Sequence, residues 1–359
     1  MIIISHGNLL TAEADALVNT VNTVGVMGKG IAMQFKRAYP ANYAGYRTAC
    51  RENQVNLGRM FVFDSARLGP RRYVINFPTK GHWRASSRLG DIQAGLADLV
   101  RVVRERKITS VAMPALGCGN GGLNWDDVRP LIEGAFAETP EVRVLLFPPE
   151  GVPDPADMPI ATERPPLTSG RVTLIQAIER YLSRARRLEP RDDVTILEIQ
   201  KIAYFLQVLG QPLRLEFSRG RYGPYAESLN HVLNRLEGHY LTGFGDRSAR
   251  VEEMQPIGLI PDAADAVADW SRAHGAAATE TLDQLARLTD GFEAPYSLEV
   301  LATVHYAAAS HPPTDDLDEL TERVRSWRGR KARLFTAAHI ELAYERLQSV
   351  RLLPALPVA

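Results

Sequence analysis

Two glycine-rich turns are the segments of this sequence best suited to chemistry. One reads GVMGKGIA over residues 25–32 and the other LGCGNGGL over residues 116–123; each follows an apolar run typical of a strand and precedes a stretch typical of a helix. At such junctions, unpaired backbone N–H groups and the positive end of the helix dipole attract phosphate, and glycine allows close approach. The pair predicts a ligand with two phosphates at the carboxyl edge of a sheet.

The letters of these turns exclude the two commonest nucleotide-binding motifs. A Walker A loop needs glycine where Thr23 stands and Ser or Thr where Gly30 follows Lys29. Neither turn combines G-x-G-x-x-G with an acidic residue at the end of the next strand, as the fingerprint of a dinucleotide fold requires. The eight histidines show no HxxxH or HExxH spacing, so we expect neither a metal site nor a cofactor. Cys118 has no evident partner base and is interpreted as a packing residue, not a nucleophile.

The elements that would position these turns alternate between strand and helix over residues 1–147. This alternation predicts an α/β sandwich, in which helices cover both faces of a mixed, largely parallel sheet. The expected strands are 1–5, 15–22, 59–64, 71–77, 110–116 and 142–147, and the expected helices are 28–38, 42–52, 86–106 and 124–137.

A proline-rich stretch divides the chain. Residues 148–166 hold seven of the 23 prolines, which favours an extended spacer, so we place a linker at 148–170 between domains at 1–147 and 171–359. A chain of 359 residues also favours two domains. The second domain is expected to be mostly helical, with a small hairpin within 212–225. Its predicted helices are 173–187, 194–209, 225–236, 262–273, 279–288, 296–308, 314–325 and 336–352.

Composition limits the cellular location and the binding partners that we expect. No apolar run reaches the ~20 residues of a membrane span, the N-terminus does not resemble a signal peptide, and two cysteines cannot form a disulfide scaffold; we expect a cytoplasmic protein without membrane contact. The net charge of zero hides 18 basic against 12 acidic residues in 1–147, and 24 against 30 afterwards. This asymmetry suits a polyanion at one end and a cationic partner at the other, although such sums are also common by chance.

Taken in order, GNLL (7–10), ADALVNTVN (14–22), GVMGKGIA and MPALGCGNGGL (113–123) resemble the macrodomain family, which binds ADP-ribose. GVMGKGIA together with NFPTKGHWR (76–84) resembles the branch of the DarG antitoxins, which remove ADP-ribose from DNA, and their protein-directed animal relative. The resemblance implies a macrodomain fold over 1–147.

The resemblance also implies site residues. Asn8 and Leu9 would hold the adenine, Asn22 the distal ribose, and Ile31 would pack on the sugars. The protein-directed relative has a catalytic Asp in the second turn, where this chain has Asn120. The full set implied to bind ADP-ribose is Asn8, Leu9, Thr20, Val21, Asn22, Ile31, Thr79, Gly117, Cys118, Gly119, Asn120 and Gly121.

Lys80 is the residue that the resemblance implies to be catalytic. As an amine it could attack the anomeric carbon of the distal ribose, and as an ammonium it could protonate the leaving group. The nucleophilic route needs its pKa to be lowered from ~10.4. Without the motif, an exposed loop lysine would be the simpler interpretation. His82, Trp83 and Arg84 are candidate DNA contacts; for Trp83, partial burial against the following helix is an equal alternative.

The segment ILEIQKIAYFLQVLGQPLRLEFSRGRYGPYAESLNHVL (196–233) resembles the SocA/Panacea-type helical domains of bacterial antitoxins. The tyrosines of RYGPY are interpreted first as core or capping residues and second as partner contacts. Three functions remain open. The first is an antitoxin that removes ADP-ribose from thymidine in single-stranded DNA and binds its cognate ADP-ribosyltransferase toxin through the C-terminal domain. The others are a protein-directed ADP-ribosyl hydrolase and a non-catalytic ADP-ribose reader.

Overall fold

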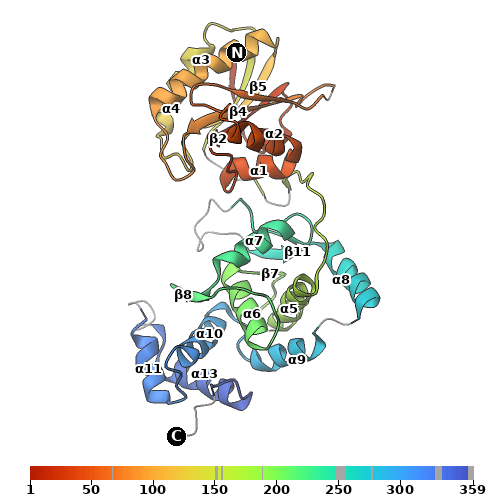
Figure 1. Ribbon diagram of the computed structural model, residues 1–359, viewed down its shortest axis with the longest axis vertical. Coiled ribbons are helices and arrows are strands. Elements are labelled where there is room, and N and C mark those ends of the chain that lie inside the picture. The colour runs from red at the N-terminus through yellow and green to blue at the C-terminus, as the bar shows by residue number, and fades with distance from the viewer. Residues whose placement is uncertain are drawn as a thin grey trace. The chain divides into compact units, whose positions relative to one another are not determined.

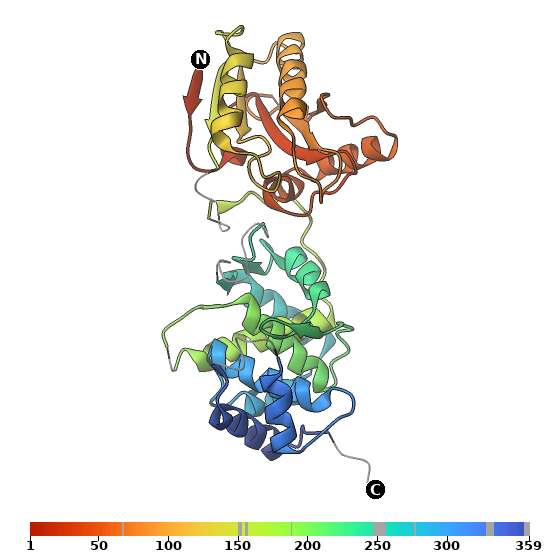
Figure 2. The same ribbon diagram turned by 90° about the vertical axis from the view of Figure 1, so that its left-hand side faces the viewer.

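The computed structural model describes residues 1–66, 68–149, 153–154, 157–187, 189–246, 256–275, 278–327 and 334–354. The chain divides into two compact units, and the division falls in the sequence between Glu163 and Arg164 (Figures 1 and 2). The units are described one at a time below.

The first unit is built on a six-stranded sheet in the order β1-β6-β5-β2-β4-β3. Only β3 runs antiparallel to its neighbour, so the prediction of a mixed, largely parallel sheet is confirmed. The strands are β1 Ile2–Ile4, β2 Ala16–Asn22, β3 Phe61–Asp64, β4 Tyr73–Lys80, β5 Ser110–Pro114 and β6 Arg143–Phe147.

Helices cover both faces of this sheet, because its central strands are apolar on both sides. Ala16 and Val18 of β2 belong to a buried cluster that includes the apolar sides of α3 and α4, whereas Leu17 between them belongs to a second cluster that includes α1. Successive strand residues point to opposite faces, so one apolar strand serves two layers. The helices are α1 Gly30–Ala38, α2 Pro40–Arg51, α3 Leu89–Glu105 and α4 Trp125–Phe136, with a short 3₁₀ turn η1 at Leu9–Thr11.

The strand β4 is longer than its sequence predicts. We expected it to end at Phe77, because the following Pro78 lacks the N–H that a central strand needs. In the structure Pro78 pairs with Val21, and a register shift between Val21 and Asn22 brings Asn22 opposite Lys80. Lys80 is therefore the last residue of β4 and not a residue of the loop beyond it.

The proline-rich stretch is not an open spacer along its whole described length. Met158 packs against the buried cluster of the first unit, and the Ala161 N–H donates to the Arg37 carbonyl at 2.9 Å. The first helix of the second unit begins at Ser169. Composition predicted extended chain here, but it could not show that part of the chain lies along the domain it leaves.

The second unit is mostly helical, as predicted, and each of the eight expected helices is present with small shifts at its ends. They are α5 Ser169–Ala185, α6 Ile196–Val208, α7 Glu227–Leu236, α8 Pro261–His274, α9 Thr279–Leu288, α10 Pro295–Ala309, α11 Leu317–Arg325 and α13 Ala337–Ser349. The expected hairpin is also present, as β8 Ser218–Gly220 and β9 Gly223–Tyr225.

A small antiparallel sheet in this unit was missed by the sequence analysis. Its strands are β7 Asp193–Val194, β10 Leu241–Thr242 and β11 Ile257–Leu259, in the order β10-β11-β7. Strands of two or three residues are too short to carry the alternating pattern by which strands are recognised.

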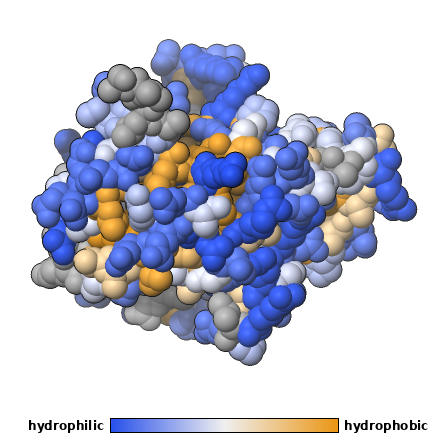
Figure 3. Space-filling view, turned by 90° about the horizontal axis from the view of Figure 1, so that it is seen from below, coloured by the Kyte–Doolittle hydropathy of each residue, from blue (hydrophilic) through white to orange (hydrophobic). Residues whose placement is uncertain are grey.

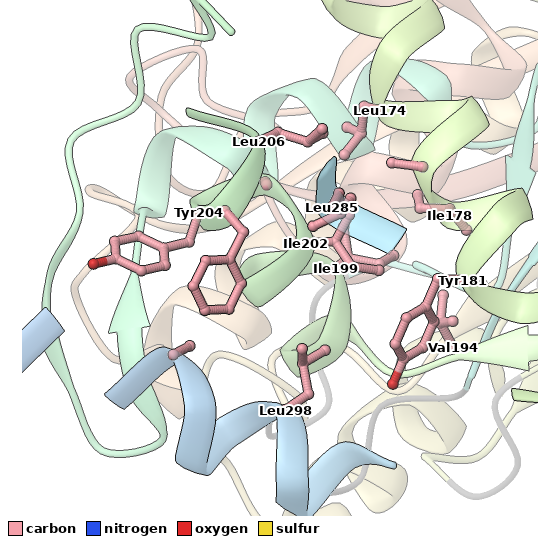
Figure 4. Close-up of a cluster of buried hydrophobic side chains, with 14 of the residues drawn as sticks. Leu174, Ile178, Tyr181, Val194, Ile199, Ile202, Tyr204, Leu206, Leu285 and Leu298 are labelled. Carbon is pink, nitrogen blue, oxygen red and sulfur yellow. The ribbon is translucent and has the colours of Figure 1, made fainter. Parts of the chain in front are cut away.

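The core of the second unit surrounds α6. Figure 4 shows Ile199 and Ile202 of α6 among side chains of α5, α9 and α10, including Ile178, Leu285 and Leu298. Most residues of α6 are buried, which explains why its apolar pattern extends around the helix.

Two polar residues of α6 hold the RYGPY turn inside this core. The buried Lys201 ammonium donates to the Pro224 carbonyl at 2.9 Å, and the buried Gln200 amide bonds both the N–H and the carbonyl of Ala226. The Tyr225 hydroxyl bonds the Asn230 side chain. These contacts favour the core interpretation of the turn.

Apolar side chains also reach the surface of the second unit, where Figure 3 shows them gathered between hydrophilic ones. Within the described residues, no helix combines the length and the apolar character needed to cross a bilayer.

The packing of α3 on β4 generates a prediction. A Cβ added to Gly95 would lie 2.2 Å from Phe77 Cζ. The backbone of α3 at Gly95 therefore packs directly on the Phe77 ring of β4, the strand that carries Lys80. Alanine gains ~1 kcal/mol in helix propensity, but overpacking costs ~1–3 kcal/mol. We expect Gly95→Ala to lower the free energy of unfolding by about 1–2 kcal/mol, measured by urea unfolding of the full chain.

Gly134 in α4 is the matched control, because a Cβ there would meet nothing within 4 Å. Gly134→Ala should raise the unfolding free energy by about 0.5–1 kcal/mol. Equal or greater stability of Gly95→Ala than of Gly134→Ala would contradict the close packing.

Candidate functional site

The two glycine turns lie against each other at the carboxyl edge of the sheet. A Cβ on Gly30, which has a φ of +59°, would come within 3.0 Å of the Asn120 side-chain nitrogen. The Lys80 ammonium donates to the Asn120 backbone carbonyl at 2.8 Å. The structure therefore brings both turns and the predicted catalytic lysine together. We call residues 23–31, residues 116–123 and Lys80 the two-loop site.

The first turn is shaped by the side chain of Asn22. Its Oδ1 accepts from the N–H groups of Val24 and Val26 at 3.1 and 3.2 Å, and its Nδ2 donates to the Val26 carbonyl at 2.6 Å. The Tyr46 hydroxyl donates to the Asn22 carbonyl at 2.5 Å. Asn22 is buried and its amide is already used by the loop. Its predicted contact with a ribose stays a prediction, and it requires one of these bonds to be shared.

The second turn needs glycine at two positions. A Cβ on Gly121 would lie 2.3 Å from the Gly117 carbonyl oxygen, and a Cβ on Gly117 would lie 2.9 Å from Leu123 while straining a φ of +73°. Among the described residues, none accepts a hydrogen bond from the backbone N–H of Gly119, Asn120 or Gly121. Consecutive free N–H groups of this kind can bind an anion.

The helices that follow the two turns differ. Lys29 precedes α1, and its side chain makes no capping bond. At α4, by contrast, the Asn124 side chain caps the Asp126 N–H, and Asp126 and Asp127 already place negative charge in the first turn. The sequence analysis expected both helix N-termini to attract phosphate. For α4 this expectation is wrong, and only the backbone of the second turn remains suited to an anion.

Lys80 is half-buried, and that burial lowers the pKa of its ammonium from the ordinary lysine value. Its ammonium donates a hydrogen bond to a carbonyl oxygen, which brings no full negative charge to offset the cost of burial. A lysine in this environment gives up its proton more easily than one in water. The nucleophilic route requires a shift in this direction.

Cys118 is unsuited to nucleophilic chemistry. Burial raises the pKa of its thiol to about 11, and its Sγ lies 3.6 Å from the Leu116 carbonyl oxygen. At neutral pH the side chain is a neutral thiol, so its interpretation as a packing residue agrees with its surroundings.

The segment that follows Lys80 presents aromatic and basic side chains. The Thr23 hydroxyl donates to the Gly81 carbonyl at 2.7 Å and so ties this segment to the first turn. Trp83 is 45% exposed, and the Arg84 guanidinium lies 4.4 Å from its ring centre. His82 stacks loosely on the same ring at 5.3 Å. This exposure agrees with Trp83 as a stacking platform and is equally compatible with partial burial of the side chain, so both interpretations stay predictions.

Asn8, which the resemblance implies to bind the adenine, forms hydrogen bonds within the protein that the sequence did not indicate. Asn8 Oδ1 caps η1 by accepting from the Leu10 N–H at 3.0 Å. Asn8 Nδ2 faces the Asp157 carbonyl at 3.2 Å and Met158 Sδ at 3.4 Å. The capping bond fixes the orientation of this amide, so Asn8 offers a donor to its surroundings. Leu9 beside it is buried.

The remaining predicted residues are less open than the resemblance implies. Thr79 is 4% exposed, and its hydroxyl approaches the Val21 carbonyl at 3.4 Å. Val21 is buried in the cluster with Tyr46, whereas Thr20 and Ile31 are partly exposed. Thr79 and Val21 support the strand ends from inside.

A buried asparagine cluster beneath the site was missed. Asn76 Oδ1 accepts from Asn19 and Asn42 at 3.0 and 3.3 Å, and Asn76 Nδ2 donates to Asn42 at 2.7 Å and to the Phe61 carbonyl at 3.2 Å. These bonds join β2 and β4 to α2 and β3. The signal was an asparagine inside each of two apolar strand sequences, because a buried amide needs a partner.

Comparison with known proteins places these features in a family. The Macro domain family model matches residues 18–132. The DNA ADP-ribosyl glycohydrolase of Mycobacterium tuberculosis is 43% identical over 356 residues, which cover 97% of this chain and 99% of that protein. The protein of the same name from Thermus aquaticus is 44% identical over 346 residues, which cover 95% and 91%. A solved structure, the macrodomain of Mycobacterium tuberculosis DarG, is 54% identical, covers 42% of this chain and 99% of that one, and has a TM-score of 0.41.

Within the part of the chain that the structure describes, no three His, Cys, Asp or Glu side chains gather as a metal site would require.

The identity extends through both units and over nearly the whole length of the relatives. The chain belongs to the DNA ADP-ribosyl glycohydrolase family, and its first unit is a macrodomain.

Proposed function

We propose that this protein hydrolyses the bond between ADP-ribose and thymidine in single-stranded DNA, and that it acts as the antitoxin of a cognate DNA ADP-ribosyltransferase. The names of the full-length relatives support the reaction. The observation that carries the proposal is the two-loop site, in which a lysine with a lowered pKa adjoins free backbone N–H groups.

The second turn would bind the diphosphate of ADP-ribose through the N–H groups of Gly119, Asn120 and Gly121, with Gly117 and Cys118 shaping the turn. The remaining contacts of the proposed site are those that the resemblance implies. Asn8 and Leu9 would meet the adenine, Ile31 the sugars, and Thr20, Val21, Asn22 and Thr79 the strand ends beside the distal ribose.

Lys80 would act as the nucleophile. Its neutral Nζ attacks the anomeric carbon of the distal ribose while the bond from that carbon to the base nitrogen breaks. The electron pair of that bond stays on the base nitrogen, which takes up a proton from the Nζ that has become positively charged. The adduct then opens its ring: the bond from the anomeric carbon to the ring oxygen breaks, the ring oxygen takes up the second Nζ proton, and the anomeric carbon forms an imine with Nζ. Water adds to this imine, its two protons return to Nζ as the carbon–nitrogen bond breaks, and ADP-ribose leaves as the aldehyde, which closes its ring again. Backbone dipoles at the diphosphate hold the sugar in place throughout.

DNA is favoured over protein as the substrate for two reasons. The second turn carries Asn120 where the protein-directed relative has an acid, and Asn120 contributes its backbone carbonyl to Lys80. The exposed Trp83 with Arg84 and His82 beside it offers a stacking surface and a cation next to the site, which suits an unpaired base and its phosphate.

We further propose that the second unit binds the toxin. A protein of Thermosipho africanus named as a fusion of DNA ADP-ribosyl transferase and glycohydrolase is 34% identical over 142 residues, which cover 35% of this chain and 37% of that protein. The two activities are therefore joined in one relative. The acidic balance of residues 148–359, 30 acidic against 24 basic, suits a partner with a cationic DNA-binding surface.

The proposed reaction predicts how Lys80→Ala behaves on two substrates offered side by side, an ADP-ribosylated oligonucleotide and an ADP-ribosylated protein. We expect the unaltered protein to release ADP-ribose from DNA, and Lys80→Ala to lose about 10²–10⁴-fold in turnover while it still binds ADP-ribose. Lys36→Ala, which removes a lysine on α1, is the control and should keep its rate. Release from protein alone, or near-normal turnover by Lys80→Ala, would refute the proposal.

The lowered pKa of Lys80 predicts a pH profile. Because the neutral amine is the reactive form, kcat/KM, which reports groups of the free protein, should rise with pH and level off below the ordinary lysine pKa of ~10.4. Stopped assays across pH 6–10 would measure this rise of the rate with pH. Borohydride added during turnover should trap an adduct on Lys80. If Lys80 were the general acid instead, the rate would fall as pH passes its pKa and no adduct would be trapped.

Toxin binding by the second unit predicts that catalysis and inhibition are separable. The full-length Lys80→Ala variant should still suppress DNA modification by the cognate transferase, with the inhibition complete near equal concentrations. The readout is incorporation of ADP-ribose from NAD into an oligonucleotide. If the variant leaves the rate of modification unchanged, neutralisation depends on hydrolysis alone and the second unit has no such role.

A further inference from the structure

The macrodomain has a second hollow at the opposite edge of its sheet. A cavity of about 560 Å³ lies where β2, β4, β5 and β6 begin, whereas the two-loop site lies where β2, β4 and β5 end. Four cations line it: Arg72, Arg106, Lys107 and Arg143. We call this cavity the amino-edge pocket. It shares no residue with the two-loop site.

The carboxylates of the pocket are used locally. Asp15 accepts from the Thr109 N–H and hydroxyl at 2.8 and 2.6 Å and from the Ser110 N–H at 3.0 Å. Glu13 forms an ion pair with Arg71 at 3.2 Å. Because the donors to Asp15 are neutral, its carboxylate keeps its charge, so the lining holds the two acids Glu13 and Asp15 together with the four cations.

The cations themselves are largely uncompensated. Arg72 is paired with Asp64 at 2.9 Å, whereas Arg143 donates to the Glu13 backbone carbonyl at 2.7 Å. Among the residues that the structure describes, neither Arg106 nor Lys107 forms an ion pair. Among the described residues, the exposed Arg106, Lys107 and Arg143 therefore share one hollow without an ion pair, and the lining holds more cations than carboxylates.

Several contacts keep these cations in place. The Tyr73 ring lies between two guanidinium groups, with Arg72 at 4.9 Å and Arg106 at 5.5 Å from its centre. Lys107 has a φ of +53° and is held by its N–H bond to the Arg104 carbonyl at 3.2 Å, just past the end of α3. Holding like charges together in this way costs free energy that a bound anion would recover.

The chemistry of the lining indicates the ligand. Guanidinium groups bind phosphate oxygens in pairs, and a lysine adds a point charge. A volume of about 560 Å³ lies in the range of small-molecule sites and exceeds what a lone phosphate needs. We propose that the amino-edge pocket binds a phosphate-bearing ligand, supplied either by the backbone of single-stranded DNA or by a free phosphorylated molecule.

The proposal is independent of the hydrolase activity and is tested by binding. Amide resonances of the full-length, ¹⁵N-labelled chain are followed during titration with pyrophosphate. We expect Lys107, Thr109 and Ser110 to shift, and the dissociation constant read from them to weaken about tenfold in Arg106→Gln/Lys107→Gln. Gly119 and Gly121 report separately on the two-loop site, so the failure of one site would not be mistaken for failure of the other.

Arg51→Gln/Arg59→Gln is the matched control, because it removes the same charge from exposed positions outside the pocket. It should change the dissociation constant less than twofold. Cations near the end of α3 also complement the helix dipole, so binding and not stability is the readout. Pyrophosphate binding that is equal in both double variants and in the unaltered chain would overturn the proposal.

A second arm separates the two sources of phosphate. Unmodified oligothymidine is titrated at several salt concentrations. If the DNA backbone is the ligand, the slope of log K against log salt should fall by about 1.4 in Arg106→Gln/Lys107→Gln, since each single-strand phosphate contact contributes ~0.7. An unchanged slope together with weakened pyrophosphate binding would assign the pocket to a free phosphorylated ligand.

Discussion

The two-loop site depends on the way β2 and β4 end beside each other. Pro78 pairs with Val21 inside the strand, and the register shift that follows sets Lys80 opposite Asn22. From that position the Lys80 side chain reaches Asn120, and the Asn22 side chain folds back to hold the first turn. One irregularity in a parallel strand pair thus aligns the lysine with both glycine turns. A regular register would place Thr79 where Lys80 lies and would turn the lysine to the other face.

Three buried asparagines beneath the site bond to one another and connect β2 to β4. Asparagine inside an apolar strand is unfavourable unless its amide is bonded, and Asn19, Asn42 and Asn76 satisfy most of each other's demand. Asn19 Oδ1 is buried without a partner among the described residues. Directional bonds of this kind fix the relative height of β2 and β4 more precisely than apolar packing, which tolerates small slips. The cluster is therefore well suited to fixing the lysine's position.

Much of the fold and of the two-loop site could be predicted from the sequence, and the features that were missed have physical causes. Apolar periodicity located the strands of the first unit and the predicted helices, because burial of a strand or of a helix face is a local pattern, whereas the short strands β7, β10 and β11 were missed. The glycine spacing located both turns. The continuation of the strand through Pro78 was missed because a proline within a run argues locally against a central strand, and the sequence shows no sign of the register shift that follows it, where Thr79 is the extra residue of β4. The roles of Asn22 and Asn8 as loop and helix caps were also missed, since an asparagine that can bind a ligand can equally bind its own backbone.

The neighbourhood of Lys80 and the anion-binding turn has a consequence for catalysis. Burial lowers the pKa of the ammonium in the free protein, but a diphosphate on the second turn would add negative charge nearby. At ~8 Å and an effective dielectric constant of ~20, each charge favours the ammonium by about 2 kcal/mol, which exceeds one pKa unit. Displacement of water by the substrate acts in the opposite direction. In the proposed complex, the free N–H groups of Gly119, Asn120 and Gly121 would reduce the first effect, because their dipoles partly offset the charge of the diphosphate. The backbone proposed to bind the ligand would thereby help to keep the neighbouring amine neutral.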